Sequence, residues 1–224
     1  MAKRKLKKFA EVSAFDNCFF LSFEQAREGG LPLKGSWHKE YFKNDNPIVL
    51  ELGCGKGEYS VGLAKNNPGK NYIGVDIKGN RIWTGATEAL NSKLKNVAFV
   101  RTRIDFIDHC FSENEVSEIW ITFPDPQPQK TRARKRLTHM MFINRYKKFL
   151  KAGCLIHLKT DSTSFYEYTL EVIAENKFTL VFNTSDLYEN CPAGREELIN
   201  IKTHYEKLFT DKGEKIKYCC FKIN

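Results

Sequence analysis

Glycine and acidic residues follow two short apolar runs in the first half of the chain. Glu51-Leu52-Gly53-Cys54-Gly55-Lys56-Gly57 ends the first run, and Asp76 ends the second, 21 residues after Gly55. Glycines at such a point let the backbone turn tightly and approach a ligand closely. A carboxylate after the neighbouring strand can accept hydrogen bonds from ribose hydroxyls. We therefore expect Glu51, Gly53, Gly55 and Asp76 to bind a nucleoside-containing cofactor.

The acid at position 51 distinguishes between two classes of cofactor. A pyrophosphate is anionic and gains nothing from a carboxylate below the glycine loop, so a nicotinamide dinucleotide fits poorly. A cofactor with a cationic amino group and no phosphate fits better, and S-adenosylmethionine is such a cofactor. A nicotinamide-dependent oxidoreductase and a turn that binds nothing remain as weaker alternatives.

A later segment combines a rigid acid with a cluster of cations. Phe123-Pro124-Asp125-Pro126-Gln127-Pro128 follows an apolar run, and its prolines restrict the backbone on both sides of Asp125. Residues 130–136 then carry five cations and no acid. A fixed carboxylate beside cations that contact phosphates is suited to chemistry on a nucleic acid, with Arg132, Arg134 and Arg136 as phosphate contacts. The alternative is a solvated proline-rich turn followed by an ordinary charged surface.

Two further polar segments stand close to predicted strands. Lys159-Thr160-Asp161 ends a strand, and Asp161 could bind a ligand there or cap the next helix. Thr203-His204-Tyr205-Glu206 precedes the last strand, and physical reasoning alone predicts only the start of a surface helix.

Alternating strands and helices are predicted to position these residues. The expected strands are 48–52, 72–76, 97–100, 118–123, 154–158, 178–182 and 216–221, and the expected helices are 58–65, 80–91, 104–111, 138–150 and 164–175. This alternation predicts an α/β, Rossmann-like fold, with a seven-stranded, mostly parallel sheet and helices on both faces. Ligands bind such sheets beyond the carboxyl ends of the strands, where the candidate residues fall. Residues 1–45 lie outside the pattern as a basic N-terminal extension, and 46–224 form one domain.

Composition narrows the class of protein. The chain is 42% hydrophobic, which is enough for a packed core, and it has neither an apolar run of membrane-spanning length nor a signal peptide. Its seven cysteines lack zinc-site spacing and its five histidines form no cluster, so we expect reduced thiols, no metal and a cytoplasmic location.

The net charge points to a polyanionic partner. Residues 1–8 and 130–136 carry +5 each of the total of +9, so the remainder of the chain is close to neutral. Such clustering is typical of proteins that bind a polyanion. For residues 1–8, a solubilising tail is as good an interpretation as an RNA contact.

Together these motifs resemble those of the bacterial tRNA (guanine-N7-)-methyltransferases. The similar segments are ELGCGKG, FPDP with a basic run that ends in KRL, KTD, and the late TxYE, and the resemblance covers about residues 45–224. It implies the class I methyltransferase fold. It also implies methyl transfer from S-adenosylmethionine to N7 of a guanine in the variable loop of tRNA.

The resemblance also implies roles for individual residues. Cofactor positions are Glu51, Asp76 and Asp125, with Asp125 also the candidate catalytic residue, and substrate positions are Asp161, Thr203, Tyr205 and Glu206. The chain departs from the family in three places. Gln127 stands where the family often has Trp, and Gln129 stands where it has a substrate-contacting Lys, so Lys130 is the candidate substitute. Arg103 aligns with an acid that contacts the cofactor in the family, so the nearby Asp105 is the candidate cofactor-binding residue instead.

Other functions remain open on the sequence alone. One is a class I methyltransferase that acts on another RNA base or on a protein side chain. Another is a tRNA-binding protein whose methyltransferase fold is vestigial. The sequence does not distinguish a monomer from a homodimer.

Overall fold

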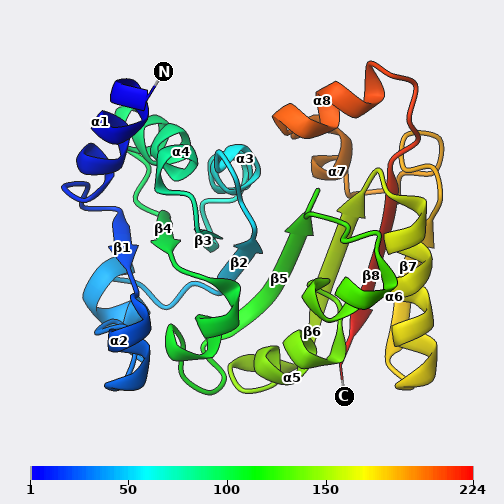
Figure 1. The fold of residues 1–224 in the computed structure, drawn as a ribbon, viewed down its shortest axis with the longest axis horizontal. Helices are drawn as coiled ribbons and strands as arrows, with labels where there is room; N and C mark the ends of the chain where they lie inside the picture. The colour runs from blue at the N-terminus through cyan, green and yellow to red at the C-terminus, as the bar shows by residue number, and fades with distance from the viewer. Residues whose placement is uncertain (1, 224) are drawn as a thin grey trace.

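Eight strands form a single mixed sheet in the computed structural model, which describes residues 2–223 (Figure 1). The strands are β1 (Cys18–Phe20), β2 (Ile48–Leu52), β3 (Asn71–Asp76), β4 (Val97–Arg101), β5 (Val116–Thr122), β6 (Leu150–Thr160), β7 (Thr179–Thr184) and β8 (Lys217–Lys222). Their order is β1-β4-β3-β2-β5-β6-β8-β7, and β8 alone runs opposite to the other seven strands. The predicted fold class is confirmed, whereas the predicted number of seven strands is wrong.

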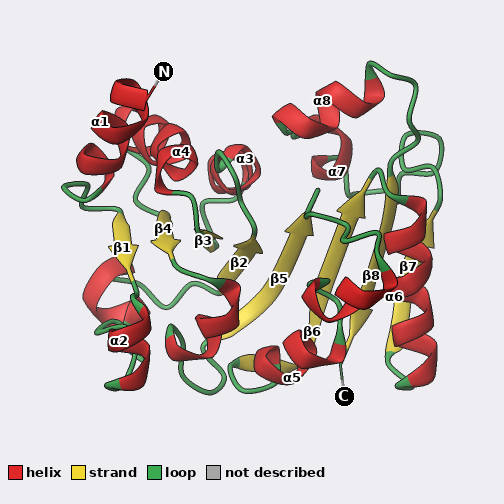
Figure 2. Ribbon diagram, in the orientation of Figure 1, coloured by secondary structure: helices red, strands yellow, loops and turns green. Residues whose placement is uncertain are grey.

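Helices cover both faces of this sheet (Figure 2). They are α1 (Ala2–Val12), α2 (Phe23–Arg27), α3 (Glu58–Asn66), α4 (Gly79–Asn91), α5 (Met140–Tyr146), α6 (Thr163–Glu175), α7 (Glu197–Asn200) and α8 (His204–Thr210). Shorter turns of π- or 3₁₀-helix span Trp37–Phe42, Ile104–His109 and Lys130–Lys135. No helix within residues 2–223 combines the length and apolarity needed to cross a membrane.

Alternation along β2 divides the core into two layers. Ile48, Leu50 and Leu52 face one apolar cluster, which includes residues of α5 and α6, whereas Val49 faces another, which includes residues of α3 and α4. All five residues of β2 are buried, as expected for a central parallel strand covered on both faces. The carboxyl end of this strand, where the glycine loop begins, is therefore held firmly in place.

The eighth strand comes from the predicted N-terminal extension. Cys18 of β1 pairs in parallel with Phe99 of β4, and α1 packs on α4. Trp37 is fully buried, its ring stacks on Phe111, and its indole N–H donates to the carbonyl of Cys110 at 3.0 Å. The strand has only three residues, so its sequence carries little periodicity.

Loss of the Trp37 side chain should destabilise the whole fold. We expect Trp37→Ala to lower the free energy of unfolding by about 3–5 kcal/mol, because it removes a large buried aromatic side chain. Phe23→Ala, in the same N-terminal segment but with a side chain that is 54% exposed, is the control and should cost far less. Urea unfolding measures both. A loss below about 1 kcal/mol for Trp37→Ala would mean that the N-terminal segment is dispensable.

Candidate functional site

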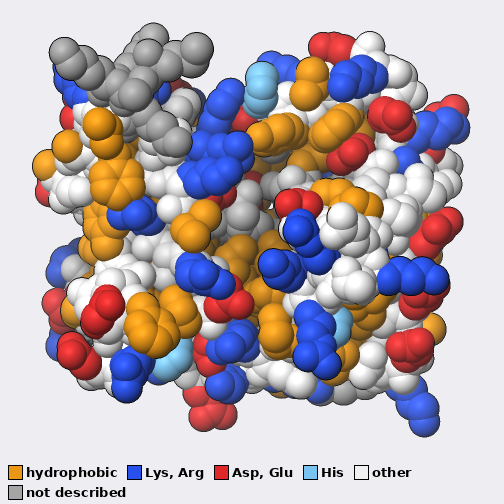
Figure 3. Space-filling model, viewed as in Figure 1, with side chains coloured by type: hydrophobic (Ala, Val, Ile, Leu, Met, Phe, Trp, Pro, Cys, Tyr) orange, Lys and Arg blue, Asp and Glu red, His pale blue; other side chains and the backbone are white. Residues whose placement is uncertain are grey.

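A cavity of about 630 Å³ lies beyond the carboxyl ends of β2, β3, β5 and β6. Figure 3 shows a hollow on this face with Lys and Arg side chains beside it. The sequence-predicted residues in its lining are Gly53, Gly55, Asp76, Asp125, Asp161, Thr203 and Tyr205. Those seven residues come from five separate segments of the chain, and the sheet edge brings them to one site.

The glycine loop takes a backbone conformation that favours glycine. Gly53, Gly55 and Gly57 have φ values of 76°, 56° and 73°. A Cβ on Gly57 would also lie 2.5 Å from the ring of Phe99, whereas one on Gly55 would meet no atom within 4 Å. The open space beside Gly55 leaves its backbone accessible from the cavity, which a ligand-binding loop requires.

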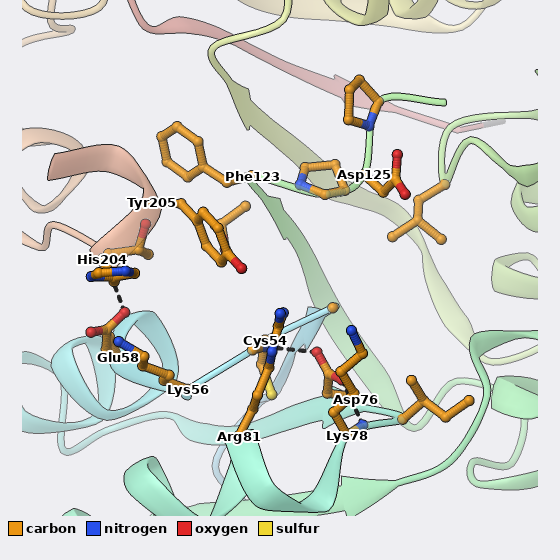
Figure 4. A pocket seen from close by; sticks show the side chains of 18 of the residues that line it. Cys54, Lys56, Glu58, Asp76, Lys78, Arg81, Phe123, Asp125, His204 and Tyr205 are labelled. Atoms are coloured by element: carbon orange, nitrogen blue, oxygen red, sulfur yellow. Dashed lines mark hydrogen bonds between the residues drawn. The ribbon is translucent and has the colours of Figure 1, made fainter. Parts of the chain in front are cut away.

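Asp76 holds the glycine loop in this position. Its carboxylate accepts hydrogen bonds from the N–H of Gly55 at 2.9 Å and from the N–H of Lys78 at 2.8 Å. The same carboxylate lines the cavity, as Figure 4 shows. It is therefore placed where the sequence predicted it, with oxygen atoms beside the space that a ligand would fill.

Glu51, a predicted cofactor-binding residue, lies instead beneath the cavity. Its side chain is 3% exposed, and its carboxylate accepts hydrogen bonds from the N–H and hydroxyl of Ser60 and from the hydroxyl of Thr122. Burial raises the pKa of Glu51 to about 7, and the hydrogen bonds offset only part of that effect. Cofactor contact by Glu51 stays a prediction, and in this structure the carboxylate joins α3 to the end of β5.

Cys54, within the same loop, is also buried. Burial raises the pKa of its thiol well above the ordinary range, so it stays protonated and unreactive at neutral pH. The thiol therefore has a packing role beside the cavity.

Asp125 stands at the cavity rim on a constrained turn. Phe123 and Gln127, on either side of it, have φ values of 47° and 45°, which non-glycine residues rarely adopt. The Asp125 carboxylate accepts a hydrogen bond from the N–H of Gln127 at 3.1 Å, and its side chain remains exposed. Such strain is typical of functional turns, because the surrounding structure must maintain it.

The basic segment beside Asp125 is a short 3₁₀-helix followed by one buried cation. Arg136 is 7% exposed, donates two hydrogen bonds to the carbonyl of Gln127 at 3.2 Å, and lies over the ring of Tyr168. Its predicted phosphate contact is not supported by this position, because its guanidinium supports the turn. The exposed cations of the segment are Lys130, Arg132, Arg134 and Lys135.

Of those exposed cations, Lys135 lines the cavity and Lys130 does not. The substrate contact predicted for Lys130 is therefore not supported by its position. Asp105 is also outside the lining, where its carboxylate pairs with Arg103 at 3.1 Å, and the intervening Ile104 lines the cavity instead.

Asp161 lines the cavity and does not cap the helix after it. The N-cap of α6 is Ser162, whose hydroxyl accepts from the N–H of Phe165 at 3.3 Å. The capping alternative for Asp161 is thereby removed, and its carboxylate contributes to the cavity wall. Partial burial raises the pKa of Asp161 from its ordinary value.

Helix α8 covers one side of the cavity. Thr203 caps it, and the N–H of His204 donates to the Glu58 carboxylate at 2.7 Å. The guanidinium of Arg81 lies 5.8 Å from the centre of the Tyr205 ring. Figure 4 shows Tyr205 and His204 reaching from α8 toward the glycine loop and α4. These contacts connect α8 to segments more than 120 residues earlier in the chain.

Glu206 does not share this orientation. Its side chain is 0% exposed and its carboxylate lies 2.7 Å from the ammonium group of Lys159, itself 0% exposed. It is absent from the cavity lining. The role of Glu206 in substrate binding stays a prediction, and in this structure its carboxylate is buried and paired within the protein.

Several lining residues were not predicted. Lys56 and Glu58 belong to the glycine loop and the helix after it, so the loop motif could have indicated them. Arg81 lies on the helix after Asp76, and Phe209 stacks on Phe123 at 6.3 Å between ring centres. No sequence signal marks these two, because only the folded chain brings them to the cavity. Among residues 2–223, no group of three His, Cys, Asp or Glu side chains could hold a metal ion.

Comparison with known proteins identifies the family. The family model "Putative methyltransferase" matches residues 45–219. A tRNA (guanine-N(7)-)-methyltransferase of Bacteroides fragilis is 52% identical over 99% of this chain and 86% of its own length. The enzyme of the same name from Christiangramia forsetii is 48% identical over 99% of both chains. The chain belongs to the tRNA (guanine-N(7)-)-methyltransferase family.

Solved structures of class I methyltransferases share the fold of this family member. The 16S rRNA methyltransferase KamB superposes with a TM-score of 0.59 over 90% of this chain and 92% of its own, at 15% identity. A 16S rRNA (adenine(1408)-N(1))-methyltransferase from Catenulisporales acidiphilia gives a TM-score of 0.56 over 85% and 91%, at 12% identity. At such identities, the likeness concerns the fold alone.

Replacing the buried carboxyl group of Glu51 should change how stability depends on pH. In the unfolded chain Glu51 loses its proton near pH 4.5, whereas the folded protein retains it to about pH 7. Unfolding therefore releases a proton between these values, so raising the pH destabilises the wild type by up to about 3 kcal/mol through this group.

The variant Glu51→Gln has no ionisable group at this position. Its stability relative to the wild type should therefore increase by about 2–3 kcal/mol between pH 4 and pH 8, as measured by urea unfolding across that range. Glu171→Gln, an exposed control on α6, should show no such trend. Parallel stability curves for Glu51→Gln and the wild type would contradict the raised pKa.

Proposed function

We propose that this chain transfers a methyl group from S-adenosylmethionine to N7 of a guanine in the variable loop of tRNA. One observation supports the proposal above others: the glycine loop, Asp76 and Asp125 line a single cavity in a chain that is up to 52% identical to tRNA (guanine-N(7)-)-methyltransferases. The 16S rRNA enzymes with a similar structure share only the fold, so they do not favour a ribosomal substrate.

The cavity is suited to the proposed cofactor. Its volume of about 630 Å³ lies within the usual 300–1,000 Å³ of small-molecule sites. The accessible backbone at Gly53 and Gly55 and the Asp76 carboxylate would hold the nucleoside part of the cofactor. Its cationic amino group would face the other acidic side chains of the lining, which are Glu58, Asp125 and Asp161. When bound, S-adenosylmethionine supplies an electrophilic methyl group. The remainder of the catalytic work falls to the residues that place the guanine.

Guanine N7 carries a lone pair and no proton, so its methylation needs no general base. Catalysis then rests on orientation and on electrostatic stabilisation. The N1–H and exocyclic amine of guanine are donors on the opposite edge, and Asp161 provides a partly buried carboxylate to accept them. Asp125 at the rim would offset the positive charge that methylation places on the ring.

Exposed cations beside the cavity would bind the tRNA backbone. Lys130, Arg132 and Arg134 lie on the segment that follows Asp125, and Lys135 extends it into the cavity wall. Such contacts position a nucleic acid without reading its sequence. We also propose that the protein acts in the cytoplasm, a location in keeping with seven cysteines that are all unpaired.

Neutralising Asp125 should reduce catalysis more than cofactor binding. We expect Asp125→Asn to slow single-turnover methylation of tRNA by about 100-fold, because one negative charge is removed next to the reacting base. Calorimetry should give a cofactor dissociation constant within a few-fold of the wild type. Asp45→Asn, exposed and at the opposite edge of the sheet, is the matched control.

Two results would contradict this account. Near-normal turnover of Asp125→Asn would remove its catalytic role. A wild-type protein that binds tRNA but gives no heat with S-adenosylmethionine would indicate a vestigial methyltransferase fold.

The basic segment should govern the salt dependence of tRNA binding. Replacing Arg132, Arg134 and Lys135 with Gln should reduce the slope of log affinity against log salt by roughly 0.7–0.9 for each phosphate that the variant no longer neutralises. Binding measured between low and moderate salt gives the slope. The control replaces three exposed lysines at the opposite edge of the sheet: Lys34, Lys39 and Lys151. Equal slopes for the two triple variants would exclude the segment as a site of phosphate binding.

A further inference from the structure

One buried cation contacts two short helices, α7 and α8, of which α8 lines the cavity. Lys159 is the penultimate residue of β6, two positions before Asp161, and its side chain is 0% exposed. Its ammonium group lies 2.7 Å from Glu206 in α8 and also donates to the carbonyl of Leu198 in α7. A single charged group therefore ties α7 and α8 to the strand that ends at the cavity wall.

The Glu206 carboxylate is turned toward the protein interior. The oxygen that pairs with Lys159 also accepts a hydrogen bond from the hydroxyl of Tyr188 at 2.9 Å. The backbone N–H of Glu206 donates to the Thr203 hydroxyl at 3.1 Å, which fixes the first turn of the helix. The adjacent Tyr205 lines the cavity. The first turn of α8 thus directs Tyr205 to the ligand and Glu206 to its support.

The position of α8 depends on tertiary contacts. A helix of seven residues is not stable in isolation, so its place is set by what it packs against. The contacts of His204 with Glu58 and of Tyr205 with Arg81 are at the surface, where water competes. The buried pair is different, because removal of one partner leaves an uncompensated charge in the interior.

We infer that Lys159 and Glu206 are positioning residues: their buried ion pair fixes α8 over the cavity and so places Tyr205 and His204 against the guanine. This inference rests on the proposed function. It gives Lys159 a role in the reaction, and it gives Glu206 a role in placing α8.

The consequence should fall on the substrate side of the cavity. The glycine loop and Asp76 are held by β3 and by each other, through hydrogen bonds that do not involve α8. Displacement of α8 would therefore weaken the use of tRNA while leaving cofactor affinity within a few-fold.

A double-mutant cycle separates support from direct contact. The four proteins are the wild type, Glu206→Gln, Lys159→Met and the double variant. In Glu206→Gln, the amide oxygen can still accept the hydrogen bond from the Tyr188 hydroxyl. The double variant has no charged side chain at position 159 or 206. Measurements are the single-turnover methylation rate, the KM for tRNA, the cofactor dissociation constant and hydrogen exchange of residues 203–210. The exposed controls are Lys222→Met and Glu171→Gln.

We expect kcat/KM for tRNA to be at least 10-fold lower in each single variant than in the wild type, and hydrogen exchange in α8 to be faster. The double variant should recover at least half of that decrease on a logarithmic scale, with α8 exchange near the wild-type rate, because no uncompensated charge remains. Cofactor affinity should change little in any of them. If a single variant unfolds, which exchange in β2 would reveal, a folded and active double variant still supports the inference.

A double variant no faster than Glu206→Gln, with wild-type exchange in α8 throughout, would overturn the inference and indicate direct contact of Glu206 with the guanine. Failure of the proposed function is recognised separately, by a wild type that does not methylate tRNA. In that case the hydrogen-exchange measurements alone decide whether the ion pair fixes α8. Unchanged exchange of residues 203–210 in both single variants would overturn the inference.

Discussion

The hydrogen bonds of one buried carboxyl group connect the parts of the site that must not move relative to each other. Glu51, near the end of β2, bonds to Ser60 in α3 and to Thr122 at the end of β5, directly before the turn that carries Asp125. The glycine loop and the turn that carries Asp125 are thus joined beneath the cavity floor. Its removal from water raises the pKa of this group to about 7, so keeping it ionised above that pH lowers the stability of the folded protein. The rest of the site is built around this junction.

The second wall of the cavity is built from the far end of the chain. The strand that precedes Asp161 carries Lys159, and the buried ion pair of Lys159 with Glu206 brings α8 over the cavity. The site therefore has two sides of different origin. One is the rigid loop between β2 and α3, held by the parallel sheet. The other is a short helix, held by a buried charge and by contacts with Glu58 and Arg81.

The sequence was informative where a motif and its local structure coincide. The glycine loop, Asp76, Asp125 and Asp161 all follow strands, and the edge of a parallel sheet brings such positions together regardless of distance along the chain. It was less informative where a residue type has two uses. Glu51, Arg136 and Glu206 have the charges that a ligand would recognise, and in the structure each side chain is buried and bonded within the protein. Orientation of that kind depends on packing between distant segments, which spacing along the sequence does not encode. The short β1 escaped prediction for a related reason, because its partner β4 lies some 80 residues away.

The central claim is that the protein methylates N7 of a guanine of tRNA that is bound in this cavity. The most direct measurement is mass spectrometry of nucleosides from an unmodified tRNA transcript after incubation with the purified protein and S-adenosylmethionine. We predict 7-methylguanosine as the product, and no methylated product from a transcript whose guanosines are replaced by 7-deazaguanosine, which lacks the nucleophilic nitrogen. Methylation of another base, or equal methylation of the 7-deazaguanosine transcript, would contradict the account.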